Sequence, residues 1–398
     1  MDFSEQSKQL TKQLSKEEKK NNGIYFTPPS IIAKIIKTLF PYFKNITNVL
    51  EPSCGSGEFI QRLERFSKFK IDGIEYNETI YNSIKHKFNS TILNIDFLGW
   101  NSTKKYDLIV GNPPFYVMKK NEIKNKNYDY YYTGRPNIFI LFIAKSLELL
   151  NDNGILAFVL PKNFMNCLYY NNLRKYISNN FKIIDIIDCY KDKYLETQQD
   201  TIGFIIQKQN CVLNNPKYTL NINKYTIFNS PRIISQIKEC YSGTTTLQNI
   251  DFEVKVGNVV WNQVKDKLTN DVGETRLIYS SDIVNNQLSI KNYKNQEKKN
   301  YIKTAGKTDL LLVVNRGYGK GDYKFSYCLI DTDNPYLIEN HLICIKYKGD
   351  ITKQELRKKY ETIIKSLKNE KTKKFINLYF GNNAINTTEL CEILPIYQ

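Results

Sequence analysis

Residues 112–115 place a side-chain amide, two prolines and an aromatic ring directly after a short apolar stretch, in the order Asp107-Leu-Ile-Val-Gly-Asn-Pro-Pro-Phe115. The prolines restrict φ and remove two backbone donors, so the Asn112 side chain and the Pro113 carbonyl are left as acceptors at the end of a strand. Two such acceptors suit the N–H groups of an exocyclic amine on a planar ring, and Phe115 offers a face on which that ring stacks. We therefore predict that Asn112, Pro113, Pro114 and Phe115 are catalytic; the alternative is an ordinary loop with two prolines.

A glycine-rich turn precedes this segment, in Asn48-Val-Leu-Glu-Pro-Ser-Cys-Gly-Ser-Gly-Glu-Phe59. The pattern predicts a strand, a turn and a helix that runs to Phe66, with Gly55 and Gly57 allowing the backbone to approach a ligand closely. The dinucleotide-binding fingerprint is excluded because its third glycine is missing and because Glu51 would repel a pyrophosphate. An acidic turn suits a ligand that carries an ammonium and a sulfonium group.

Two further expected strands also end in acidic residues. Glu75 ends the strand 70–76, at the spacing where a carboxylate accepts both hydroxyls of a ribose. Asp96 ends the strand 91–97 and is placed to accept from an adenine N6 amine, while Phe97 lines the ring. With the strands before Glu51 and Asn112, four strands carry functional residues to one edge of a parallel sheet, where open α/β folds bind ligands.

The elements around these strands complete the expected sheet. Residues 30–40 and 137–150 are expected as helices, 154–161 as a buried strand, and 182–188 with 201–207 as an antiparallel terminal hairpin. Thr27 lies in Gly23-Ile-Tyr-Phe-Thr-Pro-Pro29, before the first of these helices, and is placed to hydrogen-bond across the turn. The long polar loop 116–136 is expected to be a lid near the pocket. Residues 1–22 are polar and rich in lysine, so we expect a frayed, flexible basic arm.

In this order, Phe26-Thr-Pro-Pro, Glu51-Pro-Ser-Cys-Gly-Ser-Gly, Ile74-Glu, Asp96-Phe and Asn112-Pro-Pro-Phe resemble the motifs of the gamma class of S-adenosylmethionine-dependent DNA adenine-N6 methyltransferases. The resemblance is specific over residues 23–208 and looser from there to the end. It implies a Rossmann-like methyltransferase sheet, S-adenosyl-L-methionine as cofactor and double-stranded DNA as substrate. It places Thr27, Glu51, Ser53, Glu75, Asp96, Asn112 and Phe142 at the cofactor. We expect Cys54, Gly55 and Gly57 of the turn, and the ring of Phe97, at the same site.

The resemblance also implies which aromatic residues hold the two planar rings, the cofactor adenine and the target base. Phe142 would lie against the cofactor adenine, although its helical spacing with Phe139 is equally compatible with plain core packing. Tyr194, in the linker between the two hairpin strands, matches the second aromatic that stacks on a flipped base, opposite Phe115. The register is open by one residue, but the neighbouring Leu195 has no π face to offer.

Composition limits the classes of function. The 398-residue chain is long enough for two to three domains on the usual size prior, and its 57 basic and 40 acidic residues give a net charge of +17, which favours a polyanionic partner. The alternative explanation of the positive charge is an AT-rich genome, whose codons favour lysine. Eight scattered cysteines without a Cys-x-x-Cys pair, and only two histidines, indicate a cytoplasmic protein without a metal site. The sequence contains no apolar run long enough for a membrane span.

The chain after about residue 210 changes character. We expect a methyltransferase domain over 23–240 and a mixed α+β target-recognition domain over 243–398. In the second domain, a buried strand opens into a glycine loop with Arg316, Tyr318 and Lys320, and a DNA groove is a better partner for this loop than a nucleotide phosphate. A basic surface hairpin remains the alternative interpretation.

These observations predict a sequence-specific DNA methyltransferase that acts on N6 of a flipped-out adenine. One rival is a methyltransferase of rRNA bases or of a protein glutamine, which shares the catalytic tetrapeptide. Another is a non-catalytic DNA-binding paralogue, against which the intact Gly55, Glu75 and Asn112 argue. We expect a bacterial or viral protein that acts as a monomer, with an oligomer as the open alternative.

Overall fold

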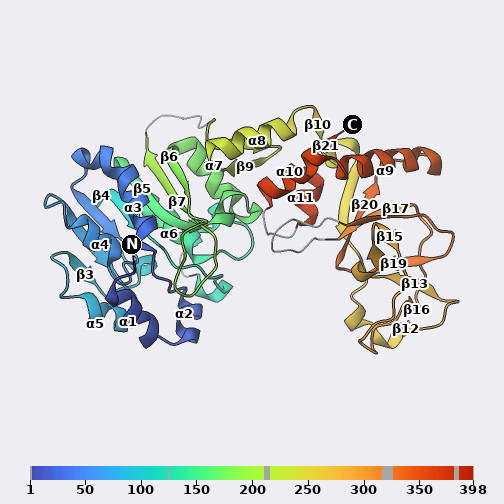
Figure 1. Ribbon diagram of the computed structural model, residues 1–398, viewed down its shortest axis with the longest axis horizontal. Coiled ribbons are helices and arrows are strands. Elements are labelled where there is room, and N and C mark those ends of the chain that lie inside the picture. Colours follow the sequence, from blue (N-terminus) through green and yellow to red (C-terminus); the bar gives the residue numbers. More distant parts are fainter. Residues whose placement is uncertain (1, 124–125, 210–215, 316–325, 381–384, 398) are drawn as a thin grey trace. The chain divides into compact units, whose positions relative to one another are not determined.

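The computed structural model describes residues 2–123, 126–209, 216–315, 326–380 and 385–397. The chain forms two compact units, Met1–Ile234 and Ser235–Gln398 (Figure 1). The division lies inside helix α8 (Pro231–Tyr241), a few residues before the boundary expected from the sequence.

A seven-stranded sheet organises the first unit, with strand order β3-β2-β1-β4-β5-β7-β6. Strands β1 to β5 are parallel, and β7 runs antiparallel to both β5 and β6. The strands are β1 (Asn48–Glu51), β2 (Lys70–Ile74), β3 (Thr91–Leu93), β4 (Tyr106–Gly111), β5 (Leu150–Pro161), β6 (Phe181–Asp188) and β7 (Thr201–Lys208). The expected fold, mostly parallel with an antiparallel terminal hairpin, is confirmed.

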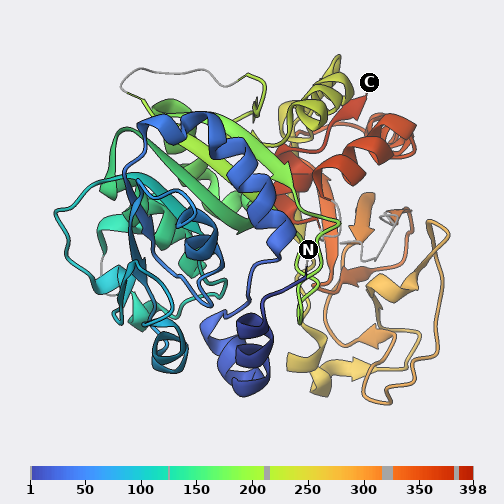
Figure 2. The same ribbon diagram turned by 60° about the vertical axis from the view of Figure 1, so that its left-hand side comes forward.

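Helices cover both faces of the sheet because successive strand residues point in opposite directions. Leu108 and Val110 of β4 join a core cluster with α3 (Pro29–Leu39) and α4 (Glu58–Leu63), and α3 lies across β6 and β7 (Figure 2). Ile109 joins a second cluster with α6 (Ile138–Leu149) and α7 (Asn171–Asn180), and so does Tyr106, which an irregularity in the β4–β5 register separates from Leu108. The parallel strands therefore end between two helical layers, at an edge where loops are free to form a site.

The third strand is shorter than the sequence indicates. It ends at Leu93 because the Asn94 side chain turns back to donate to the carbonyls of Glu75 (2.8 Å) and Tyr76 (3.1 Å). Asp96 then accepts from the backbone N–H of Leu98 (2.9 Å) and caps the short helix η2 (Phe97–Gly99). Asp96 and Phe97 consequently lie in a turn after the strand.

The N-terminal segment differs from the flexible arm expected for residues 1–22. It folds into two helices, α1 (Glu5–Gln13) and α2 (Lys16–Asn22), each capped by a serine side chain at Ser4 and Ser15. Leu10 and Leu14 are buried against Phe26 and against Ile80 of α5 (Glu78–Ile84). Their short apolar face finds partners distant in the sequence, which composition does not reveal.

Two further segments of the first unit pack against its helices, the loop 116–136 and a β-hairpin. The loop 116–136 contains the 3-10 helices η3 (Lys120–Glu122) and η4 (Lys126–Tyr131), and the hydroxyl of buried Tyr128 donates to Glu148 (2.9 Å). The hairpin β8 (Thr219–Ile222) and β9 (Tyr225–Phe228) packs on α7, where the fully buried Arg174 donates to the Thr226 carbonyl (2.6 Å).

The second unit is mixed α+β, as expected. Two four-stranded sheets have the orders β11-β20-β17-β18 and β12-β16-β13-β19, and two-stranded pairs join β10 with β21 and β14 with β15. The strands are β10 (Thr244–Thr245), β11 (Phe252–Val256), β12 (Leu268–Thr269), β13 (Thr275–Ile278), β14 (Ile283–Val284), β15 (Gln287–Leu288), β16 (Tyr301–Ile302), β17 (Leu311–Asn315), β18 (Tyr327–Ile330), β19 (Tyr336–Ile338), β20 (Leu342–Tyr347) and β21 (Ile396–Tyr397).

The lysine-rich C-terminal region forms α9 (Lys353–Leu367), α10 (Glu370–Tyr379) and α11 (Thr387–Glu392). Asn369 separates α9 from α10, because its side chain accepts from the backbone N–H of Lys371 and caps α10. Among the described residues, no helix combines the length and apolar character needed to cross a bilayer. Within the same ranges, no three His, Cys, Asp or Glu side chains are grouped as a metal ion would require.

Candidate active site

A cavity of about 960 Å³ lies where β1, β2 and β4 end, a size typical of small-molecule sites. Most residues predicted from the sequence line it: Thr27, Glu51, Ser53, Cys54, Gly55, Glu75, Asp96, Phe97, Asn112, Pro114 and Phe142. Gly57, Pro113, Phe115 and Tyr194 are not among its lining residues. The ends of separate strands thus meet around one cavity, as the parallel sheet requires.

The glycine turn and Glu75 hold each other in place. The backbone N–H groups of Gly55 and Asn77 donate to the two carboxylate oxygens of Glu75, each at 2.8 Å. Gly55 has φ +50° and Gly57 has φ +79°, a region that favours glycine. A side chain at Gly57 would also collide with the ring of Phe88, 2.3 Å from the nearest ring atom, so this glycine serves the turn and its packing.

Among the carboxylates that line the cavity, three are no more than 8% exposed: Glu51, Glu58 and Glu75. Burial raises the pKa of Glu75 to about 7, against the lowering effect of its backbone hydrogen bonds. Burial, with the nearby Glu75 and Glu58 charges, also raises the pKa of Glu51 well above its ordinary value, and Glu51 Oε2 has no hydrogen-bond partner among the described residues. Such a site is electrostatically incomplete until a cation enters, which fits a ligand with ammonium and sulfonium groups.

Cys54 is structural in character. Its side chain is 4% exposed and belongs to the core cluster beneath α3. Burial raises the pKa of the thiol well above its ordinary value, so Cys54 stays neutral and is a poor nucleophile.

An aromatic wall forms beside Asp96. The rings of Phe97 and Phe142 lie 5.0 Å apart and both line the cavity, which provides an apolar surface for a planar ring. Behind them, buried Lys145 donates to the carbonyls of Leu98 (3.1 Å) and Trp100 (2.5 Å), and its Nζ lies 5.2 Å from the centre of the Phe97 ring. Lys145 thereby ties the turn of Asp96 to α6, a role that sequence reasoning missed because a lone lysine in an apolar helix gives no signal of its own.

Asn112 has one end of its amide fixed and the other end open. Its Nδ2 donates to the Tyr25 carbonyl (3.0 Å), and this acceptor requires the amide nitrogen at that position. Oδ1 is buried and lacks a hydrogen-bond partner among the described residues. The Ser53 hydroxyl donates to the Asn112 backbone carbonyl (3.1 Å) and joins this turn to the acidic one. The arrangement presents an unused acceptor beside the cavity.

Phe115, the last residue of the tetrapeptide, is packed between Phe139 on one side and Gly23 on the other. The half-buried ring of Phe115 packs edge-on against Phe139, with 5.9 Å between centroids. Gly23 lies so close that a side chain there would stand 2.7 Å from the Phe115 backbone nitrogen. The turn therefore has little freedom to rearrange.

Tyr194 and Phe115 are not brought to the same cavity. Tyr194 packs against the cluster beneath α3 and its hydroxyl donates to Thr201 (3.3 Å), while the adjacent Leu195 is 44% exposed. A small second cavity runs from Tyr194 to Tyr25 and Phe26. The stacking role of Tyr194 stays a prediction. Arg316, Tyr318 and Lys320 lie outside the described residues.

Sequence reasoning also missed the contribution of the N-terminal helices and of Tyr116, which lines the cavity after Pro114. The cavity wall includes residues 20–26, which run from the end of α2 into the Phe-Thr-Pro-Pro segment. The available signal was Gly23, a helix-ending glycine immediately before that segment.

Comparison with known proteins adds independent findings. The family model for Eco57I restriction-modification methylases matches residues 2–195. The modification methylase CviBIII of Paramecium bursaria Chlorella virus NC1A is 30% identical over 400 residues, which cover 97% of this chain and 96% of that protein. The type II methyltransferase M.CvrRI of Paramecium bursaria Chlorella virus XZ-6E is 27% identical, with 99% of both chains covered.

Among solved structures, the fold resembles that of the protein in the cryoEM structure of a DrdV–DNA complex. The TM-score is 0.55 at 12% sequence identity, and the similarity covers 98% of this chain and 57% of that one. At this identity the likeness concerns the fold alone.

Proposed function

Because this chain belongs to the type II DNA methyltransferases of restriction-modification systems and uses S-adenosyl-L-methionine, we propose that its substrate atom is N6 of adenine in duplex DNA. The family and the cofactor define a sequence-specific DNA methyltransferase. The identity of the methylated atom is the further step.

One observation supports an amine as the target: the buried Oδ1 of Asn112, which lacks a partner among the described residues and is oriented by the Tyr25 carbonyl; the choice of adenine follows the resemblance of the sequence motifs. A buried acceptor without a donor is costly, so it indicates a ligand that brings an N–H group. An exocyclic amine of a base does so. Methylation at a ring carbon uses a thiolate nucleophile instead, and the cysteine that lines the described cavity, Cys54, is held as a neutral thiol.

The residues of this chain divide the work as follows. S-adenosyl-L-methionine supplies an electrophilic methyl group when bound. Asn112 Oδ1 and the Pro113 carbonyl accept the two amine hydrogens, which draws the nitrogen lone pair out of conjugation. Deprotonation needs no strong base, because the nitrogen becomes acidic only after it is alkylated and its proton can leave to solvent.

The target base has to leave the duplex to reach this site. Phe115 is proposed to stack on one face of the flipped adenine, since its ring is half-buried and backed by Phe139. Tyr194 remains our candidate for the other face. It lies in the linker between β6 and β7, where its partly buried ring packs against the core cluster and its hydroxyl donates to Thr201.

We propose that the second unit is the target-recognition domain, and its hairpin β14–β15 is the described element best suited to base reading. Asn285 and Asn286 both have positive φ (51° and 63°), which forms a tight turn, and Asn286 Oδ1 accepts from the Tyr327 backbone (3.2 Å). Residues 283–296 contain no carboxylate but six Asn or Gln side chains and two lysines. Amide side chains read adenine edges, and exposed Leu288 and Ile290 suit thymine methyl groups.

The protein is further proposed to act as a monomer in the cytoplasm of a bacterial or virus-infected cell. One chain carries both the cofactor cavity and the proposed recognition unit, so a second copy is not required for a complete enzyme.

The proposal is tested by expressing the chain in cells that lack DNA methylation and analysing their nucleosides by mass spectrometry. We expect N6-methyladenine, confined to one sequence when the methylated positions are mapped. N4-methylcytosine would keep the amine chemistry but refute the choice of base, and 5-methylcytosine would refute both.

A further inference from the structure

The helices α1 and α2 form a pair that packs onto the cofactor cavity. Figures 1 and 2 both draw them, in dark blue, beside α5 at one end of the sheet. Leu10 and Leu14 anchor the pair through apolar contacts, with exposures of 1% and 4%. Beyond these contacts, the pair is fastened by three polar anchors. Two of them end on residues that line the cavity, and the third ends on the linker between β6 and β7.

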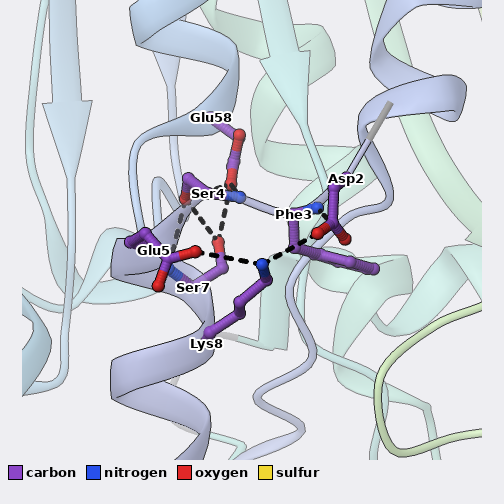
Figure 3. A network of polar contacts seen from close by, with 7 residues as sticks. All are labelled: Asp2, Phe3, Ser4, Glu5, Ser7, Lys8 and Glu58. Atoms are coloured by element: carbon purple, nitrogen blue, oxygen red, sulfur yellow. Dashed lines mark hydrogen bonds and ion pairs between the residues drawn. The ribbon is translucent and has the colours of Figure 1, made fainter.

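The first anchor is a network around Glu58, at the start of α4 (Figure 3). Glu58 Oε1 accepts from the hydroxyls of Ser4 (2.5 Å) and Ser7 (2.6 Å), and from the Ser4 backbone N–H (3.3 Å). The Ser7 hydroxyl also lies 2.8 Å from that of Ser56, in the glycine turn. Burying a carboxylate is costly, and here Glu58 accepts from the neutral donors of Ser4 and Ser7, about fifty residues away in sequence.

The second and third anchors hold α2. Glu18 accepts from Asn77 Nδ2 (2.8 Å), and the backbone of Asn77 donates to Glu75. Lys19, 4% exposed, pairs with Glu196 (2.7 Å) in the linker that carries Tyr194. The pair therefore connects the glycine turn, the end of β2 and the β6–β7 linker.

This placement has two consequences at the site. Residues 20–24 form part of the cavity wall, and the chain leaving α2 passes Gly23 to reach Tyr25, whose carbonyl aims Asn112. If α1 and α2 moved away, the cavity wall would open, and the Tyr25 carbonyl would no longer orient the Asn112 amide. Helices that served stability alone could pack anywhere on the surface, whereas α1 and α2 contact the glycine turn, the end of β2 and the β6–β7 linker.

We propose that α1 and α2 form a cap on the cofactor site and that Glu58 is the positioning residue that holds this cap closed, so that cofactor exchange requires breaking its contacts with Ser4 and Ser7. The proposal rests on cofactor use and not on the choice of adenine. A failure of the adenine assignment would leave it standing.

The test measures how fast labelled S-adenosyl-L-methionine dissociates from the full-length protein in a chase experiment. In Ser7→Ala and Glu58→Gln, which remove or weaken a charge-assisted hydrogen bond, we expect roughly tenfold faster dissociation and a raised KM for the cofactor. The KM for DNA should not change. Ser4→Thr keeps the hydroxyl and should behave like the parent, whereas Ser4→Ala should release the cofactor faster.

The matched control is Lys8→Ala, on the same helix. Lys8 pairs with Asp2 (2.8 Å) and Glu5 (3.0 Å), as Figure 3 shows, and the side chains of both acids are about 80% exposed. Its removal should leave the dissociation rate within twofold. Equal rates in the control, in Ser7→Ala and in the parent would overturn the proposal, as would equally fast release in all variants.

Hydrogen exchange on the unaltered protein decides the matter if the variants do not fold. We expect the amides of residues 5–22 to become better protected when S-adenosylhomocysteine binds, because opening the cap then also requires loss of the ligand. Identical protection with and without the ligand would show that the helices are not coupled to the cofactor site.

Discussion

At the scale of single residues, Asn112 and Phe115 are expected to do separable work. Asn112→Ala removes the acceptor that activates the amine, so the single-turnover methylation rate should fall by orders of magnitude while DNA affinity holds. Phe115→Ala removes a stacking surface worth roughly 1–3 kcal/mol, so it should lower the population of flipped base. The fluorescence of 2-aminopurine at the target position reports that population.

A suitable control for Phe115→Ala is Tyr130→Ala, because Tyr130 is an aromatic residue that is 71% exposed and does not line the cavity. It should flip and methylate normally. If Asn112→Ala and Phe115→Ala both methylate like the parent, the assignment of the active site to residues 112–115 is wrong.

Glu75 predicts a pH dependence of cofactor affinity. Its pKa of about 7, raised by burial from the ordinary 4.5, means that the cofactor-free site is half protonated near neutrality. A protonated carboxyl cannot accept from both ribose hydroxyls, so calorimetry should show affinity rising from about pH 6 to 8 as the proton is lost. Glu75→Gln should bind weakly with a flatter profile, any remaining slope reporting Glu51. A flat profile in the parent would remove Glu75 from the site.

The raised pKa of Glu75 also affects the stability of the cofactor-free fold. This stability contribution falls with rising pH, whereas the cofactor affinity rises. A carboxyl whose folded pKa lies above its unfolded value stabilises the cofactor-free fold most below about pH 4.5, and this contribution is lost as the pH rises through about 7. Bound cofactor should offset that loss, because it stabilises the ionised form. Thermal melts of Glu75→Gln, with and without cofactor, separate this contribution from those of other groups.

At the scale of elements, the sequence predicted the features that depend on local backbone rules, namely the strand ends and the glycine turn. Strand ends that carry Glu51, Glu75 and Asn112 meet at one edge because parallel strands must, and the glycine turn follows from its own backbone needs. The helices α1 and α2 were missed because only Leu10 and Leu14 mark their buried face. Their polar partners, such as Glu58, become visible only once the chain is folded.

The hairpin β14–β15 should control which sequence is methylated and not how fast. Gln287→Ala and Leu288→Ala are expected to relax the preference at one base pair each, at a cost of about 1–3 kcal/mol per lost contact. Mapping methylated sites in DNA from cells that express each variant would detect the change. Val272→Ala, at a residue 78% exposed on another loop of the same unit, is the control. Unchanged site preference in both hairpin variants would exclude the hairpin from base reading.

At the scale of the whole molecule, the division of labour predicts how a fragment behaves. A fragment ending near Gln209 would lose β9, leaving Arg174 without the Thr226 carbonyl and the core without Phe228, so it should be markedly less stable. Residues 1–230 keep both contacts and every residue of the cofactor cavity. We expect this longer fragment to bind S-adenosyl-L-methionine close to the full-length affinity and to lose selective DNA binding, as calorimetry and competition with unrelated duplexes would show. A folded 1–230 fragment that still methylates one defined sequence would place target recognition in the first unit instead.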